Sequence, residues 1–395
     1  MKFFHPADIL LPRVSYEQWA TIACDQHTSD PAYWEKADAI VEDKPSALRL
    51  ILPEVYLSHD NSKRIATINR TMQGYLNHNL FTEYEDALIY LERTLPSGKI
   101  RRGIVGAVDL DAYDFQKGAT SPIRATEETV ADRLPPRVAI RRGAALELPH
   151  IMLLINDSKR SVIEPLENAK KDFTLLYDFD LMLGGGHVKG YLVTKESAKA
   201  IDHALEMLYE KSPLLFAVGD GNHSLATAKT CYEEKPSLLS RSALVEVVNI
   251  HDEALEFKPI YRVLFGVEPT SLLQELKAYF EKYSANDKQK VTAVFGDAEE
   301  TIEIPAITTL ALSTLQQFLD DYLKTHPEVT IDYIHGVEET RSLAKKENTV
   351  GFLFDGMKKE ELFPAVEKDG ALVRKTFSMG EAAEKRYYIE ARKIQ

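Results

Sequence analysis

The strongest constraint on this chain is a strand, a glycine turn and a helix that follow one another without a linker. Leu214 to Val218 (LLFAV) is a short apolar run typical of a buried strand, and a helix is expected from about Ser224. Between them stands the turn Gly219-Asp220-Gly221-Asn222-His223-Ser224. Two glycines allow the backbone a positive φ and a close approach to a ligand. We therefore expect an α/β protein with a functional turn where this strand ends.

The start of the helix is a predicted anion site. Its first backbone N–H groups have no partners within the helix, and the helix dipole is positive at that end. Phosphate suits such a site above all, and His223 and Ser224 add side-chain donors. Asp220 would repel a bare phosphate, so we expect it to hold a metal ion, a ribose hydroxyl or a substrate hydroxyl. The plainer alternative is a glycine turn in which Asn222 or Ser224 caps the helix.

Two common nucleotide motifs do not match this turn. The Walker A spacing, Gly-x-x-x-x-Gly-Lys-Ser/Thr, is missing. A Gly-x-Gly-x-x-Gly dinucleotide fingerprint does not open a helix here either. The turn therefore predicts anion binding without assigning a known nucleotide-binding class.

A second cluster runs from Ser121 to Arg137. Arg124, Arg133 and Arg137 are close in sequence, although the protein is acidic overall. Arginine binds phosphate and carboxylate through paired donors, so these residues could neutralise an anionic ligand. The alternative is a solvated helix on which acidic neighbours such as Glu127 pair with the arginines.

Two further clusters are less specific. Cys24-Asp25-Gln26-His27-Thr28 places many polar groups before a helix whose N-cap is expected to be Asp30. A catalytic thiol or a metal site there is a weaker hypothesis than helix capping, since no spacing points to further ligands. Arg374 to Ser378 (RKTFS) offers cations and hydroxyls that could close over an anion, and the alternative is a charged surface turn.

Composition excludes some classes of protein. The chain has 61 acidic and 48 basic residues and a formal charge of −13, which disfavours nucleic acid as a partner. Two cysteines cannot form a disulfide framework or a cysteine-rich zinc site. The N-terminus lacks a signal-peptide layout, and no window has the roughly 18 apolar residues of a membrane span. We expect a cytoplasmic protein without membrane contact.

Apolar periodicity predicts the outline of the chain. Three regions are expected: an N-terminal α/β region at 1–110, a central core at 111–270 and a C-terminal α/β domain at 271–395. Strands are predicted at 104–110, 150–155, 187–193 and 244–250, and helices at 31–42, 61–77, 82–93, 195–211 and 380–392.

Several motifs together resemble domain-of-unknown-function family 1015. That family shows a strand, then Ala-Asp-Gly-His-His-Arg and a helix, and Gly219 to Ser224 stand in that place. Glu127-Glu128-Thr129, with Asp132-Arg133 behind it, is similar to the family's His-Glu-x-Thr element, with Thr126 in place of the histidine. The segments 6–10, 257–264 and 374–378 resemble further blocks, so the resemblance covers nearly the whole chain.

The resemblance implies a ParB/sulfiredoxin-like central core with N-terminal and C-terminal α/β additions. One branch of that fold contains free serine kinases, which use ATP or ADP. By this resemblance Glu127 would be the general base, Asp220 would hold Mg²⁺ or a hydroxyl, and Asp25, Gln26 and His27 would contact the substrate. The predicted catalytic residues are Glu127, Asp220 and His223, and the predicted phosphate or nucleotide contacts are Gly219, Gly221, Asn222, His223, Ser224, Arg124, Thr129, Arg133 and Lys375.

Two departures from the family pattern weaken the kinase interpretation. Ser224 stands where the family has arginine, and Asn222 where it has the first histidine. Loss of a cation beside the phosphates should cost roughly 1 kcal/mol of nucleotide binding. The leading hypothesis is a phosphotransferase for a small hydroxylated metabolite, with L-serine as the first guess. The alternatives are a non-catalytic nucleotide or anion sensor and, less favoured, a ParB-like DNA-partition protein; a homodimer is left open.

Overall fold

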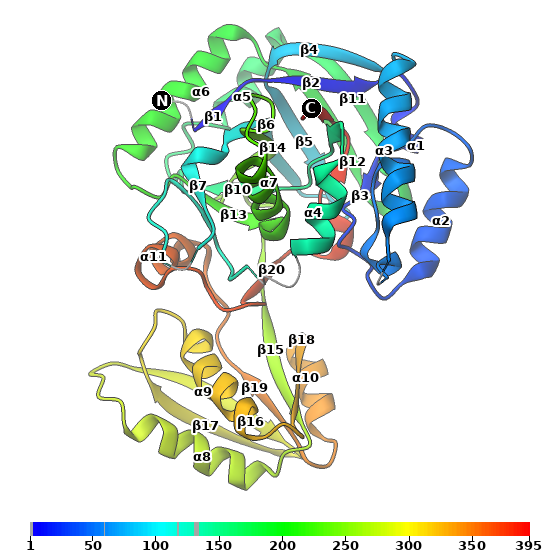
Figure 1. Cartoon of the computed structure of the whole chain (residues 1–395). Helices are drawn as coiled ribbons and strands as arrows, with labels where there is room; N and C mark the ends of the chain where they lie inside the picture. Colours follow the sequence, from blue (N-terminus) through cyan, green and yellow to red (C-terminus); the bar gives the residue numbers. More distant parts are fainter. Residues whose placement is uncertain (1–2, 59, 117, 130–133) are drawn as a thin grey trace. The chain divides into compact units, whose positions relative to one another are not determined.

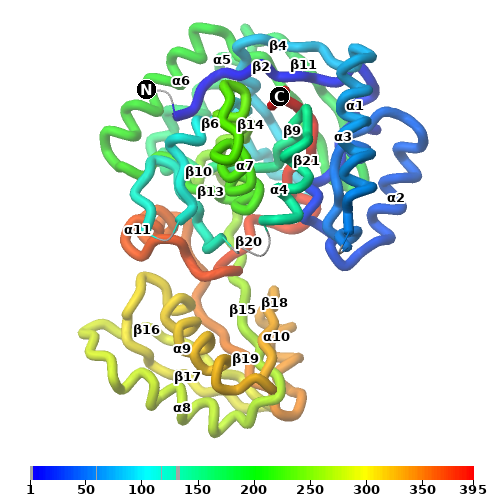
Figure 2. Tube along the Cα trace, in the orientation of Figure 1, coloured from blue at the N-terminus to red at the C-terminus, as the bar shows by residue number. Residues whose placement is uncertain are grey.

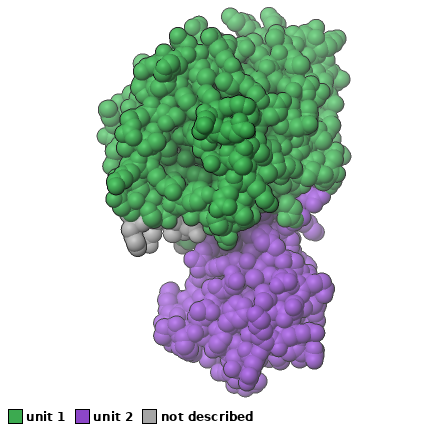
Figure 3. Space-filling view, turned by 90° about the vertical axis from the view of Figure 1, so that its right-hand side faces the viewer, with its two compact units in different colours: residues 1–255, 380–395 green, residues 256–379 purple. Residues whose placement is uncertain are grey.

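The structure is a computed structural model that describes residues 3–58, 60–116, 118–129 and 134–395. The chain forms two compact units: residues 1–255 with 380–395 are unit 1, and residues 256–379 are unit 2 (Figure 3). The last segment belongs to unit 1 because its strands pair there. β21 (Tyr387–Tyr388) pairs with β3 (Thr21–Ile22), and β22 (Arg392–Lys393) pairs with β9 (Leu146–Glu147).

Unit 1 is built on a mixed sheet that has ten strands in the described part of the chain. The order is β11-β12-β5-β6-β14-β10-β13-β8-β7, and β1 pairs with β6. The pairing is antiparallel except for β10 with β14, β13 with β8 and β7 with β8. The strands are β1 (Phe4–His5), β5 (Ile89–Thr94), β6 (Ile100–Asp109), β7 (Tyr113–Asp114), β8 (Ile123–Ala125), β10 (Met152–Ile155), β11 (Thr174–Asp180), β12 (His187–Leu192), β13 (Phe216–Asp220) and β14 (Ser242–Asn249).

Both faces of this sheet are covered, which explains its apolar central strands. Every residue of β14 is buried, and successive residues alternate between two cores: Leu244 packs in one, and Val245 in the other. Figure 1 and Figure 2 show the helices and strands of unit 1, coloured along the chain from blue at the N-terminus to red at the C-terminus. Unit 1 also contains short 3₁₀ helices, the strand pair β2 (Ala7–Pro12) and β4 (Phe81–Ala87), and the α-helices α1 (Tyr16–Trp19), α2 (Pro31–Val41), α3 (Ser62–Asn77), α4 (Leu134–Arg142), α5 (Pro165–Ala169), α6 (Lys195–Tyr209) and α7 (Asn222–Glu234).

Local sequence signals explain several of these elements. Asp30 accepts a hydrogen bond from the Tyr33 amide and caps α2, with Pro31 at its first position, as predicted. β11 and β12 form an antiparallel hairpin around Gly184 to Gly186. The strand before the glycine turn is β13, and the helix after it is α7, as the sequence indicates.

Two helix predictions are wrong. Residues 82–93 form parts of β4 and β5, because β4 pairs with β2 and β5 lies between β12 and β6 in the buried sheet. Residues 380–392 contain β21 and a 3₁₀ turn at Ala382–Glu384 instead of a charged helix. In both segments the tertiary pairing of the backbone overrides a helix-compatible side-chain pattern.

Unit 2 is an α/β unit with its own core and a largely antiparallel sheet of the order β17-β16-β19-β15-β18, to which β20 is added through β15. No helix in the described ranges is long and apolar enough to cross a bilayer. The elements are β15 (Phe257–Phe265), β16 (Lys288–Phe295), β17 (Ala298–Pro305), β18 (Thr330–His335), β19 (Thr349–Leu353), β20 (Phe377–Met379), α8 (Pro269–Glu281), α9 (Ala311–Thr325), α10 (Val337–Ala344) and α11 (Lys359–Asp369).

Candidate functional site

The candidate site lies in unit 1, where β13 passes into α7. Gly221 is the residue between them, with φ 80° and ψ 29°. A Cβ there would lie 3.0 Å from Ile151 Cα and 3.1 Å from Ile151 Cγ1, so space as well as conformation requires glycine. The Asp220 carboxylate accepts a hydrogen bond of 2.9 Å from the Gly221 amide. The turn is thus fixed against β10, the strand that follows Ile151.

The first turn of α7 is not capped by a side chain. Within the described ranges, no hydrogen bond uses the backbone amide of Asn222 or of Ser224 as its donor. The Asn222 side chain, which could have capped the helix, instead accepts from the Thr126 amide at 3.2 Å. Thr126 also donates its hydroxyl to the Val218 carbonyl at 2.6 Å, which ties β8 to the turn. The plain N-cap alternative therefore does not describe this helix start.

His150 lies beside this helix start. The Ser224 hydroxyl is 3.2 Å from His150 Nε2, and an Asp25 carboxylate oxygen is 3.6 Å from the same nitrogen. The other nitrogen, Nδ1, is 2.8 Å from the Tyr388 hydroxyl, which also accepts from the Cys24 amide. The structure thus gathers residues from distant parts of the sequence around one buried imidazole.

The charges of His150 and Asp25 stabilise each other. Burial opposes a charge on His150, but the Asp25 and Asp220 carboxylates together outweigh it and raise the imidazole pKa above 6.5. Burial also opposes ionisation of Asp25, and the charge of His150 outweighs it and lowers the Asp25 pKa below 3.8. The two groups form an imidazolium–carboxylate pair.

This arrangement is not a hydrolase triad. In such a triad the aspartate orients the imidazole nitrogen that faces away from the serine. Here Asp25 and Ser224 approach the same nitrogen, and Tyr388 occupies the opposite one. A protonated His150 donates hydrogen bonds and cannot take a proton from Ser224. The cluster is suited to hold a hydroxyl group beside α7.

A second cation at the turn comes from the C-terminal segment. Lys385 Nζ lies 3.2 Å from the Asp220 carboxylate, and both side chains are mostly buried. Lys385, which pairs with Asp220, and Tyr388, which contacts His150, therefore bring the segment 380–395 into the site.

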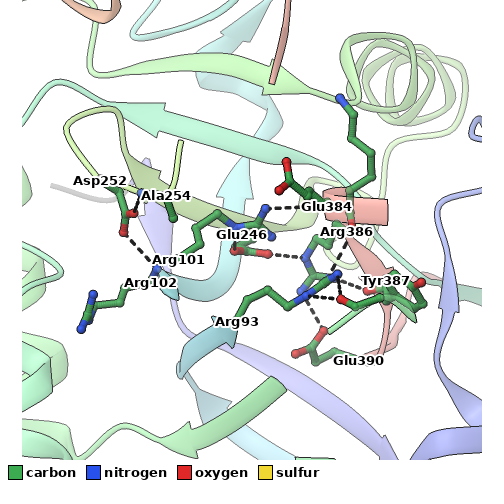
Figure 4. Close-up of polar contacts among 12 residues, drawn as sticks. Arg93, Arg101, Arg102, Glu246, Asp252, Ala254, Glu384, Arg386, Tyr387 and Glu390 are labelled. Atoms are coloured by element: carbon green, nitrogen blue, oxygen red, sulfur yellow. Dashed lines mark hydrogen bonds and ion pairs between the residues drawn. The ribbon is translucent and has the colours of Figure 1, made fainter. Parts of the chain in front are cut away.

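Buried ion pairs hold this segment in place (Figure 4). Arg386 donates to Glu246 at 2.8 Å and to Glu390 at 2.8 Å, and all three residues are buried. Arg93 on β5 donates to the carbonyls of Gly185 and Ala383. Removing one member of such a network leaves an uncompensated buried charge, which typically costs about 3 to 5 kcal/mol. The network thus fixes the backbone on both sides of Lys385.

A cavity of about 140 Å³ adjoins the cluster. Asp25, His150 and Ser224 line it at its polar part, together with Tyr388 and Thr227. The rest of its wall is mostly apolar and comes from segments around Leu50, α4 and the stretch before β10. A small molecule in this cavity would contact the first turn of α7.

The structure brings together part of the predicted site. Asp25 and Ser224 meet at His150, and Gln26 donates to Asp25 at 3.1 Å. Asp220 and Asn222 lie in the adjoining turn, where they contact Lys385 and Thr126. His27 stacks on Tyr33 with ring centroids 3.7 Å apart, which occupies one face of its ring.

The predicted residues of the 121–137 cluster lie in several environments. Arg124 is buried and donates to the carbonyls of Ser121 and Thr120. Glu127 follows Thr126 directly and is half-buried, and the buried hydroxyl of Thr129 has no hydrogen-bond partner within the described ranges. Arg133 lies outside the described residues.

The other predicted contacts are at the turn and in unit 2. Gly219 and His223 are half-buried, and the His223 carbonyl accepts from the Thr227 hydroxyl. Lys375 belongs to unit 2, where its carbonyl accepts from Arg262. A role for Lys375 at the turn stays a prediction.

Sequence reasoning missed three members of the site. His150, Lys385 and Tyr388 carry no local motif: His150 follows a proline before a strand, and the other two belong to a charged run. The doubled tyrosine within that run was the one available signal, since adjacent aromatic residues favour a strand over a solvated helix.

The structure gives limited support for a metal site at Asp220. In the part of the chain that the structure describes, no group of three or more His, Cys, Asp or Glu side chains could hold one. Asp220 offers one carboxylate, which is already paired with Lys385. Mg²⁺ at nucleotide sites uses one or two carboxylates together with phosphate oxygens and water, so Asp220 fits such an ion only in the company of a nucleotide.

Fold and site define a mixed α/β protein with an uncapped helix start beside buried charges. The chain belongs to the family described as Protein of unknown function (DUF1015), which matches residues 8–392. No curated protein matches the chain.

Comparison with solved structures gives matches of low sequence identity. A variant of a free serine kinase in complex with AMP is 12% identical with a TM-score of 0.43, covering 74% of this chain and 92% of that chain. SbnI with a C-terminal truncation, from Staphylococcus aureus, is 11% identical with a TM-score of 0.38, over 70% of this chain and 82% of that chain. A conserved hypothetical protein from Pyrococcus furiosus is 12% identical with a TM-score of 0.38, over 70% and 90%.

Proposed function

We propose that the protein is a nucleotide-dependent phosphotransferase that acts on a small hydroxylated metabolite. The observation that carries this proposal is the uncapped first turn of α7, where the amides of Asn222 and Ser224 have no acceptor among the described residues. Backbone amides at a helix start bind phosphate through hydrogen bonds and the helix dipole. His150 and Lys385, which are paired with Asp25 and Asp220, place two cationic groups beside this turn.

The proposed reaction asks mainly for positioning and charge stabilisation. The hydroxyl oxygen of the metabolite would form a bond to the terminal phosphorus, while the bond from that phosphorus to the leaving nucleotide breaks. The hydroxyl proton would pass to a carboxylate, for which Glu127 is the proposed base. The phosphoryl group would lie on the α7 amides, and Asp25, Gln26 and His27 would contact the metabolite.

The finer parts of the proposal come from the family resemblance. These are the ParB/sulfiredoxin-like core, the choice of ATP or ADP, and Mg²⁺ at Asp220. Arg124, Thr129, Arg133 and Lys375 remain proposed nucleotide contacts on the same ground.

Phosphate binding at α7 is tested by a variant that introduces a negative charge into the first turn of this helix. Ser224→Asp sets a carboxylate at the third position of the helix, where it can accept from the free amides and favours the helix dipole. We expect the variant to fold at least as stably as the wild type and to bind ADP and ATP at least ten-fold more weakly by calorimetry. Ser197→Asp is the matched control, because Ser197 occupies the same position in α6.

Turnover is tested separately. Glu127→Gln should keep nucleotide affinity and lose phosphoryl transfer to a panel of hydroxylated metabolites. If wild-type protein binds nucleotide but transfers phosphate to no metabolite, the protein is a nucleotide sensor instead. If neither nucleotide binds, or if Ser224→Asp binds them as the wild type does, the proposal is wrong.

A further inference from the structure

The cavity beside His150 gives information about the substrate that the turn alone does not. Most of its wall is hydrocarbon: Leu50, Leu52 and Met72 line it, as do Ile140 of α4 and Leu146. All lie in unit 1, so the cavity is formed within one compact unit. A ligand held there must present an apolar surface to this wall, since unpaired polar groups lose their hydrogen bonds to water.

The volume of the cavity suits a ligand with a small hydrocarbon part. At about 140 Å³ the cavity is similar in size to an apolar protein cavity of about 150 Å³ that binds benzene. A ring or a branched chain of about six carbons fills such a space. We place the metabolite in the cavity and the nucleotide phosphate at the α7 amides, so that each holds a different part of the reacting pair.

Charged side chains along the wall are paired. Arg137 forms an ion pair with Glu54, and Arg141 forms one with Glu147 at 2.6 Å. The lining therefore offers no excess charge for an ammonium or a carboxylate group of a ligand. The Asp25–His150 pair is also neutral overall, so a free amino acid would bring two further charges to a lining without excess charge, which is costly.

The polar part of the lining suits a single hydroxyl group. The Asp25 carboxylate can accept a hydrogen bond from the hydroxyl group. The His150 Nε2–H, which faces Asp25 and Ser224, can donate to the hydroxyl oxygen when the ligand comes between them. Ser224, in the first turn of α7, lies 3.2 Å from the same imidazole nitrogen. A hydroxyl group held there would be next to the helix start at which the phosphate is proposed to bind.

We propose that the metabolite is an alcohol whose body is an uncharged branched or cyclic hydrocarbon of about six carbons, and that it binds in this cavity with its hydroxyl at Asp25 and His150. This inference rests on the proposed function and replaces L-serine, the first guess from the sequence, by a different substrate class. Asp25 and His150 thereby become the residues that recognise the hydroxyl group.

The experiment measures binding of two probes to the full chain, benzyl alcohol and L-serine, by calorimetry with and without ADP. We expect benzyl alcohol to bind at least ten-fold more tightly than L-serine. Ile140→Trp introduces a larger side chain into the cavity from a half-buried position. We expect it to lower the affinity for benzyl alcohol at least ten-fold and to leave the affinity for ADP unchanged. The control is Ala139→Trp, which adds the same side chain at the neighbouring exposed position of α4 and should bind both ligands as the wild type does.

Circular dichroism checks that Ile140→Trp folds; Leu148→Phe, from another part of the lining, takes its place if it does not. Equal affinity for L-serine and benzyl alcohol, or undiminished benzyl alcohol binding to a folded cavity-filled variant, overturns the inference. Failure of the proposed function gives a different pattern, in which benzyl alcohol binds and both nucleotides do not.

Discussion

Replacing Gly221 by alanine tests whether the turn before α7 is fixed by space as well as by backbone conformation. At φ 80° an L-residue is strained, and the conformation costs about 1 to 2 kcal/mol. The new Cβ would also lie 3.0 Å from Ile151 Cα, a backbone atom that cannot move without its strand. Overpacking of this kind adds about 1 to 3 kcal/mol. We expect Gly221→Ala to lose about 2 to 5 kcal/mol of unfolding free energy in total.

A second glycine separates the two contributions. Gly98 has φ 84°, and a Cβ at this position would have no atom within 4 Å, so Gly98→Ala carries the conformational cost alone. Both glycines lie in unit 1. The difference between the two variants is the contribution of the contact with Ile151, which we expect to be about 1 to 3 kcal/mol.

Tryptophan fluorescence during urea unfolding is the assay. The chain has two tryptophans, Trp19 and Trp34, both buried in unit 1, so the signal reports unfolding of that unit. The midpoints give the free energies if the slopes agree between variants. Equal losses for the two alanine variants would refute the steric argument, and wild-type stability of Gly221→Ala would refute the conformational one as well.

Three further predictions concern the groups around the site. The stability of unit 1 should fall as pH rises from 6.5, the ordinary pKa of histidine, through the raised pKa of His150, because the folded state holds the proton more tightly; thermal melts of His150→Gln should lose this slope. Glu390→Gln should cost about 3 to 5 kcal/mol in urea unfolding because it breaks a fully buried pair, whereas Lys393→Met, which removes an exposed one, should cost under about 1 kcal/mol; similar losses would contradict the buried network. Burial raises the pKa of Cys24 to about 11, so in a Cys231→Ser background iodoacetamide should label the folded protein at least roughly 100-fold more slowly than the unfolded one, and fast labelling would contradict this environment.

Much of the fold follows from patterns along the chain. The capping of α2 by Asp30 and the succession of β13, turn and α7 depend on neighbouring residues, and the sequence predicts both. The segments 82–93 and 380–392 have helix-compatible patterns and are not helical, because their strands are selected by partners elsewhere in the chain. The site shows the same division: the sequence predicts the turn, and it does not predict the imidazole beside it.

The sequence alone determined that a backbone turn with a left-handed glycine would begin a helix after an apolar strand, since φ, glycine and helix start are local properties. Only the tertiary structure decided which side chains surround that helix start. Lys385 and Tyr388 reach it because buried ion pairs and strand pairing hold the last segment of the chain in unit 1, and His150 reaches it from the stretch before β10, which pairs with β13. A buried charge is stable only beside its partner, and when that partner is far away in the sequence, folding alone brings the two together.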